Sequence, residues 1–170
     1  VVLLGGRIGE KAFNNWENIE SVTMPANLSE IGAKAFEGCK NLKTAVIPDK
    51  VTTIGEYAFA SCSSLTSIVI PNSVTSMGQY VFNDCYNVKT LSIGTGLNNL
   101  ADYAFHGCRA ITSVVIPDNI ERIKHGTFAH CSSLENITIG KGLNLVYPYA
   151  FNASTNLKNI TYTGNQKVTI

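Results

Sequence analysis

Apolar residues recur along this chain at every 23rd position. Every phenylalanine belongs to one column of this repeat and every cysteine to another, with none left over. The phenylalanines are Phe13, Phe36, Phe59, Phe82, Phe105, Phe128 and Phe151, and the cysteines are Cys39, Cys62, Cys85, Cys108 and Cys131. Self-similarity at this period is typical of a solenoid, in which each turn packs on its two neighbours.

The residues that follow each phenylalanine predict a short β-strand. After Phe59, apolar residues stand six, nine and eleven positions on, at Leu65, Ile68 and Ile70. The last two positions are two residues apart and are dominated by β-branched residues across the repeats, which is strand periodicity. Pro71 then ends the strand because proline cannot donate to a ladder. Equivalent strands on about seven successive turns should pair into one parallel β-sheet.

The second half of each repeat carries two further apolar positions, such as Val74 and Met77, followed by Gly78. This half is too short for an ordinary α-helix. We predict a short extended piece and then one 3₁₀ or helical turn that carries phenylalanine and cysteine inward. Residues 1–170 are therefore expected to form a single repeat domain with little α-helix. Because the chain begins without Met and in mid-repeat, we expect it to be a fragment or mature region of a longer protein.

The repeat resembles the BspA-like leucine-rich repeats over its whole length, from Ile8 to Ile160. The pattern that carries the resemblance is Cys62-x-x-Leu65-x-x-Ile68-x-Ile70-Pro71-x-x-Val74-x-x-Met77-Gly78-x-x-x-Phe82. The resemblance implies a right-handed solenoid that is secreted by, or displayed on, gut and oral anaerobes, with relatives in some parasitic protists. It also implies adhesion and binding of host proteins. One departure is that Lys50, Ser73 and Gly96 stand near the place of the usual strand-capping asparagine or cysteine.

The cysteines are predicted to be unpaired and buried. Five is an odd number, which argues against a complete disulfide framework. Equivalent residues on successive turns lie about 4.8 Å apart with nearly parallel Cβ vectors, whereas a disulfide needs Cβ atoms about 3.8 Å apart and crossed. In the first and last repeats Trp16 and Ser154 take the cysteine position, so these turns are expected to be degenerate ends of the stack.

Composition and motifs exclude several classes of function. The net charge is +1 and no basic stripe is present, so nucleic acid is not an expected partner. No apolar run approaches the roughly 20 residues of a transmembrane helix. The sequence has no nucleophile elbow, phosphate loop, zinc helix or carboxylate pair. We therefore expect no enzymatic activity, no cofactor and no metal.

The histidines are weak candidates for a metal site because they lack zinc-type spacing. His125 should lie beside Asp102, which holds the same repeat position one turn earlier. His106 and His130 follow their phenylalanines on adjacent turns. The alternative interpretation is that all three histidines are exposed loop residues.

The outward side of the predicted sheet is the first candidate for a ligand-binding surface, since solenoids commonly bind through such a face. Its outward residues are small and mostly neutral, and the alternative is a solvated sheet of β-forming residues. These residues are Ser21, Thr23, Thr44, Val46, Ser67, Val69, Thr90, Ser92, Ser113, Val115, Asn136 and Thr138, with Asn159 and Thr161 in the last repeat.

A column of tyrosines is the second candidate. Tyr57, Tyr80 and Tyr103 precede their phenylalanines by two residues, and Tyr149 resumes the column after Gly126. Such rings could hold a sugar or a peptide, because each has apolar faces and a polar tip. The alternative is a ladder of rings that pack on one another.

Two hypotheses for function remain open. The first is a non-catalytic interaction module, extracellular or at the cell surface, that binds a protein or glycan partner such as a host or matrix protein. The second is a structural spacer or stalk that presents another domain and has no ligand of its own. Saturable binding would distinguish the first from the second.

Overall fold

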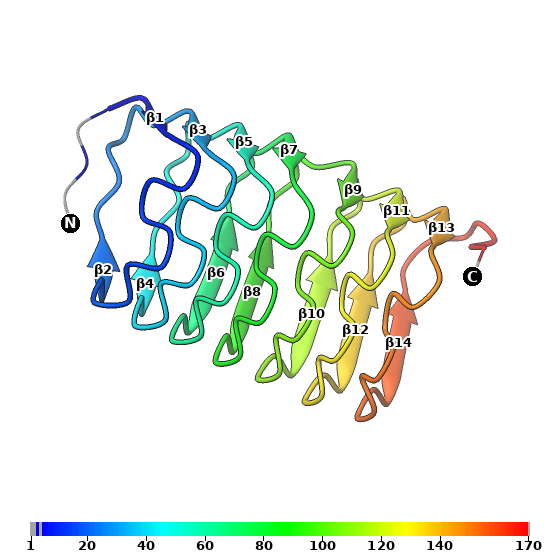
Figure 1. The fold of residues 1–170 in the computed structure, drawn as a ribbon. Helices are drawn as coiled ribbons and strands as arrows, with labels where there is room; N and C mark the ends of the chain where they lie inside the picture. Colours follow the sequence, from blue (N-terminus) through cyan, green and yellow to red (C-terminus); the bar gives the residue numbers. More distant parts are fainter. Residues whose placement is uncertain (1–2, 4, 170) are drawn as a thin grey trace.

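The computed structural model describes residues 3 and 5–169, and there the chain winds into a stack of about seven similar turns (Figure 1). Two rows of short strands run along the stack. The even-numbered strands form what we call the main face: β2 (Ser21–Val22), β4 (Thr44–Ala45), β6 (Ser67–Ile70), β8 (Thr90–Ile93), β10 (Ser113–Ile116), β12 (Asn136–Ile139) and β14 (Asn159–Tyr162). The odd-numbered strands form the back face: β1 (Arg7–Ile8), β3 (Glu30–Ile31), β5 (Thr53–Ile54), β7 (Ser76–Met77), β9 (Asn99–Leu100), β11 (Arg122–Ile123) and β13 (Leu145–Val146).

All strand pairing is parallel, and each residue pairs with its equivalent in the next repeat; Ser113, for example, lies opposite Asn136. On the main face the paired groups are β2-β4, β6-β8 and β10-β12-β14; on the back face they are β1-β3-β5-β7 and β9-β11-β13. Among the described residues, both faces lose strand pairing between the fourth and fifth turns. This break coincides with the end of a glycine column, where Ala101 replaces the equivalent of Gly78.

The glycine column allows successive turns to approach closely before that break. A Cβ atom added to Gly55 would lie 2.4 Å from the backbone nitrogen of Ala33, and one added to Gly78 would lie 2.4 Å from that of Glu56. No side chain fits at such distances, so glycine is required where backbone packs on backbone.

The predicted extended piece is confirmed as the back-face strands, but the segment that carries phenylalanine and cysteine is not helical. In the second turn, the amide of Glu37 donates to the carbonyl of Lys34 at 3.2 Å, whereas the amide of Phe36 donates across to Ala58 at 2.8 Å. The residues two before and two after each phenylalanine have positive φ, as Tyr57 and Ser61 do at 56° and 58°. A 3₁₀-helix needs negative φ throughout, so this segment is a run of turns. The described residues contain no helix.

The phenylalanines form one continuous stack through the core. Consecutive ring centroids lie 5.2–5.8 Å apart with interplanar angles of 3–14°. The rings from Phe36 to Phe128 are buried. Offset stacking of this kind adds roughly 0.5–1.5 kcal/mol per pair beyond burial of the ring area.

The five cysteines are free and fully buried, as predicted. Each thiol donates to the carbonyl of the phenylalanine 26 residues earlier in the chain, as Cys62 does to Phe36. The Sγ–O distances are 3.1–3.4 Å. Burial raises the pKa of the Cys39 thiol to about 11 and that of Cys131 to about 12. These side chains therefore stay protonated at neutral pH and act as structural groups rather than nucleophiles.

The end turns are less degenerate than the sequence suggests. Ser154 is buried and its hydroxyl donates to the carbonyl of Phe128 at 2.7 Å, so it continues the thiol ladder. Reading Ser154 as a degenerate position was wrong, because its hydroxyl donates to a phenylalanine carbonyl as the cysteine thiols do. Trp16, by contrast, is half exposed and packs edge-on against Phe13, with ring centroids 5.3 Å apart. After β14, the amide of Gln166 donates to the carbonyls of Lys141 and Leu143.

At the strand-cap position Ser73 stands in place of the usual asparagine, whereas the fifth repeat keeps an asparagine, Asn119. The Ser73 hydroxyl donates to the carbonyl of Val51 at 2.7 Å, and the Asn119 amide donates to the carbonyl of Leu97. Side chains therefore join successive turns at this corner.

The phenylalanine stack gives a direct test of the core. Phe59→Ala should lower the free energy of unfolding by about 3–5 kcal/mol, because it removes a fully buried ring and leaves a cavity. Phe13→Ala should cost less than half as much, because Phe13 is only half-buried. Urea denaturation followed by circular dichroism measures both losses. Equal losses would contradict the stacked core.

Candidate binding surface

The main face presents the side chains that the sequence predicted to point outward. All twelve residues from Ser21 to Thr138 in the two outward columns are exposed, except Thr138, which is half-buried. Between them Ile68 and Ile70 of β6 are buried in the core. The alternation follows from the pleat of a strand, which sends successive side chains to opposite sides. The structure thus gathers these residues on one surface; their role in binding stays a prediction.

Three exposed valines give this surface an apolar row. Val46 is 78% exposed, Val69 59% and Val115 65%. They occupy the same repeat position in the second, third and fifth turns, and Ser92 stands between the last two. Hydroxyl-bearing residues such as Ser67 and Thr90 form the neighbouring column. The main face therefore combines apolar contact area with hydrogen-bonding groups.

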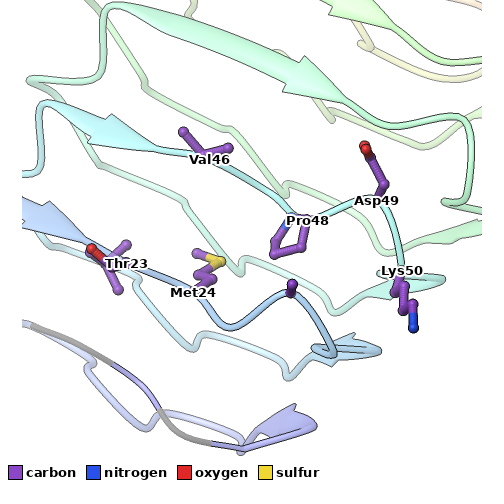
Figure 2. Close-up of a pocket in the computed structure, with 8 residues that line it drawn as sticks. Thr23, Met24, Val46, Pro48, Asp49 and Lys50 are labelled. Carbon is purple, nitrogen blue, oxygen red and sulfur yellow. The ribbon is translucent and has the colours of Figure 1, made fainter.

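A hollow of about 510 Å³ lies at the carboxyl ends of β2 and β4. Figure 2 shows Thr23 and Met24 on one turn, Val46 and Pro48 on the next, and Asp49 and Lys50 in the loop that follows. Ala26 also lines it and occupies the position that Asp49 holds one turn later. Sequence reasoning missed this hollow. The available signal was the small Ala26, at a position held by larger residues in the next five turns.

The tyrosine column forms a tight stack of three rings. The centroids of Tyr57 and Tyr80 lie 4.8 Å apart and those of Tyr80 and Tyr103 lie 4.7 Å apart, with nearly parallel planes. The Lys34 ammonium lies 5.2 Å from the Tyr57 ring centroid, and a Cβ added to Gly126 would meet the Tyr103 ring at 2.3 Å. Both ends of the stack are thus covered, and the ring faces are occupied by one another.

Tyr149 lies apart from this stack because Gly126 has no ring to bridge the gap. Its side chain is 69% exposed, and it lines a hollow of about 380 Å³ with Tyr147, Pro148 and Phe151. The column named in the sequence is therefore one stack of three rings plus a separate aromatic residue.

The histidines lie where the repeat predicts. The Nδ1 atom of His125 is 3.0 Å from an oxygen of Asp102, as expected from their shared column. His106 and His130 have ring centroids 5.0 Å apart, and Nδ1 of His106 lies 2.8 Å from the Asn83 side-chain oxygen. Within the described residues no group of three or more His, Cys, Asp or Glu side chains is placed to hold a metal ion.

One further pair was not found from the sequence. The Arg109 guanidinium carbon lies 4.6 Å from the centroid of the Tyr86 ring, and both side chains are exposed. They stand in the short turns that precede β10 and β8, beside the main face. Their column holds Glu17, Lys40 and Ser63 in earlier repeats, so no periodic pattern marks it. The main face thus has an aromatic and arginine residue at its edge, the residue types that most often dominate binding energy.

The family of this chain follows from its repeats. The family model for the BspA type leucine rich repeat region matches it in six copies, over residues 6–128 and 98–169. The protein is a parallel β-solenoid, and the chain belongs to the BspA-type leucine-rich-repeat family. No curated protein matches the chain. No helix in the described residues is long and apolar enough to cross a membrane.

Solved structures share this fold. A leucine-rich repeat protein from Bacteroides ovatus is 32% identical with a TM-score of 0.82, over 85% of this chain and 38% of that one. The T. pallidum leucine-rich repeat protein is 28% identical with a TM-score of 0.78, over 89% of this chain and 77% of that one. A leucine rich cell surface protein from Faecalibacterium prausnitzii, 22% identical with a TM-score of 0.57 over 93% of this chain and 63% of that one, shares the fold. This chain thus spans well under half of the Bacteroides protein.

The environment of His106 predicts a pH-dependent contribution to stability. Burial lowers the pKa of its imidazole below the usual 6.5; Asp84 opposes this, and His130 and Arg109 add to it. The unfolded chain therefore takes up this proton at higher pH than the folded protein does. Above the pKa of the unfolded chain, the neutral His106 imidazole contributes its full stabilisation of the fold. This stabilisation is lost as the pH falls from the unfolded pKa toward the folded pKa.

Urea unfolding across pH 8 to 5, a range of about three units around that pKa, checks this expectation. The wild type should lose unfolding free energy on acidification, and this loss should be smaller in His106→Asn. Asn occupies the same repeat position at Asn83, so the substitution fits the turn. An identical pH dependence in both proteins would show that the His106 proton is not linked to folding.

Proposed function

We propose that this chain is a non-catalytic interaction module that binds a protein or glycan partner through its main face. The observation that carries the proposal is the row of exposed valines Val46, Val69 and Val115 beside a column of hydroxyl side chains. Apolar side chains with more than half of their surface exposed contribute nothing to the core. Clustered on one regular face, they supply contact area to a partner.

The shape of the main face supports a macromolecular partner rather than a small molecule. Small-molecule sites are enclosed and bury most of their ligand. Strands β6, β8 and β10 instead lie side by side in one extended row (Figure 1), and their outward residues are exposed. Backbone pairing and buried ladders hold that surface in place, so binding would require little ordering of the module.

We further propose that the module works outside the cell, either secreted or at a cell surface. The Faecalibacterium relative of the same fold is named a cell surface protein, and the family resemblance points the same way. The thiols are compatible with an oxidising environment, because burial keeps them from solvent and raises the pKa of Cys39 to about 11. Thiols that are neither ionised nor accessible oxidise slowly.

A binding screen tests the proposed function. The purified chain is tested against extracellular-matrix proteins, mucins and glycans, together with the triple variant Ser67→Glu, Thr90→Glu, Ser113→Glu. The matched control is Thr53→Glu, Ser76→Glu, Asn99→Glu, which places the same three charges on the back face. Saturable binding should be retained by the control and reduced at least tenfold in the main-face variant, since it would bury three unpaired carboxylates.

Two outcomes would contradict the proposal. Binding that survives in the main-face variant would place the site elsewhere, with the Tyr57, Tyr80 and Tyr103 stack as the next candidate. No saturable partner in the panel would favour the alternative of a structural spacer that presents another domain.

A further inference from the structure

Several charges on this solenoid are neutralised by the equivalent residue of the next turn. Five oppositely charged pairs join equivalent positions of neighbouring repeats, with N–O distances of 2.7–3.6 Å. The pairs are Arg7–Glu30, Glu17–Lys40, Glu20–Lys43, Asp118–Lys141 and Glu135–Lys158. The period itself thus places a counter-ion within reach wherever neighbouring turns carry opposite charges in one column.

Two cations in the middle of the stack, beside the main face, have no such partner. Lys89 has neutral Thr66 and Thr112 in its column, and Arg109 has Tyr86 and Ser132. Neither cation has an ion-pair partner among the described residues. Both are exposed, and the nearby Asp84 instead faces His106, with an N–O distance of 4.0 Å. Lys89 and Arg109 therefore keep their charge available to a partner.

These cations stand at the edge of the main face. Lys89 immediately precedes β8, and its amide extends the ladder by donating to the carbonyl of Thr66 at 2.9 Å. Arg109 is in the turn before β10 and covers the ring of Tyr86, which is in the turn before β8. The stacking holds the planar guanidinium in one orientation, so less side-chain freedom is lost when it binds an anion. Val69 and Val115 lie on the strands beside them.

We propose that Tyr86, Lys89 and Arg109 form an anchor for a carboxylate of an acidic polypeptide segment that lies along the main face. The guanidinium fork and the lysine ammonium bind the carboxylate, and Val69 and Val115 contact apolar side chains of the same segment. This inference rests on the proposed function, because it assigns partner chemistry to the same face.

The chemistry of the anchor favours a polypeptide over a sulfated glycan. A polyanionic chain is held by a run of cations, whereas only two unpaired cations lie at this edge in the described part of the chain and the net charge is +1. Sugars also stack on free aromatic faces, but Arg109 already covers one face of Tyr86. The exposed valines suit apolar side chains, which a sulfated glycan lacks.

The test uses fluorescence polarisation with three labelled probes. The first is a dodecapeptide of alternating Glu and Val, the second replaces every Glu by Gln, and the third is a heparin dodecasaccharide. The variant is Lys89→Glu with Arg109→Glu. The control is Lys34→Glu with Lys124→Glu. It also combines a cation stacked on a tyrosine, Lys34, with a lysine that has no ion-pair partner in the described residues, Lys124, and both lie away from the main face.

The Glu–Val peptide should bind the wild type and the control within twofold of each other. Its affinity should fall at least tenfold in the Lys89 and Arg109 variant, and the Gln–Val peptide should bind the wild type at least tenfold more weakly. Circular dichroism should show all proteins folded. If charge reversal prevents folding, Lys89→Gln with Arg109→Gln replaces it, with the same direction expected.

Several results would overturn the anchor. They are no binding of the Glu–Val peptide, equal binding of the Gln–Val peptide, an equal loss in the control, or tighter binding of heparin than of the Glu–Val peptide. Failure of the anchor is separable from failure of the proposed function. Suppose that a partner from the screen no longer binds the Ser67, Thr90 and Ser113 variant but still binds when the charges of Lys89 and Arg109 are reversed. The main face would then remain the binding site, and the anchor would be excluded.

Discussion

The register of one full repeat between successive turns is the constraint on which the rest of this structure depends. It places the amide of Phe36 against the carbonyl of Ala58, each phenylalanine ring 5.2–5.8 Å from the next, and each thiol against a phenylalanine carbonyl. A one-residue slip would break all three at once and turn apolar side chains toward water. Stability is therefore shared among neighbouring turns.

The same register builds the candidate binding surface. Once the inward columns are fixed, the outward residues of β6, β8 and β10 fall into straight rows without contributing to the core. These positions can then differ from turn to turn, as Val69, Ser92 and Val115 do. Charges follow the same logic. Five ion pairs join oppositely charged residues at equivalent positions of neighbouring turns, whereas Lys89 and Arg109 have no counter-ion among the described residues. The proposed binding function thus depends on residues that depart from the repeat rather than on the repeat itself.

That distinction also explains how much could be predicted from sequence. The strands, the inward phenylalanines, the unpaired cysteines and the contact of His125 with Asp102 all follow from periodic columns, and each is confirmed. The run of turns was not foreseen, because its left-handed positions are mostly held by residues such as Tyr57 and Ser61 rather than by glycine. Tyr86 and Arg109 were missed because their column has no common residue type, and the hollow beside Met24 depends on packing between two turns.

Deletion of one period tests the central role of register most directly. Removing residues 60–82 takes out one whole repeat and joins Phe59 to Asn83, which keeps every column aligned. Removing residues 60–81 takes out one residue fewer and shifts all later columns by a single position. Thermal unfolding followed by circular dichroism should show a cooperative transition for the first protein and none, or a transition at much lower temperature, for the second. Equally stable, cooperatively folded products would contradict the account.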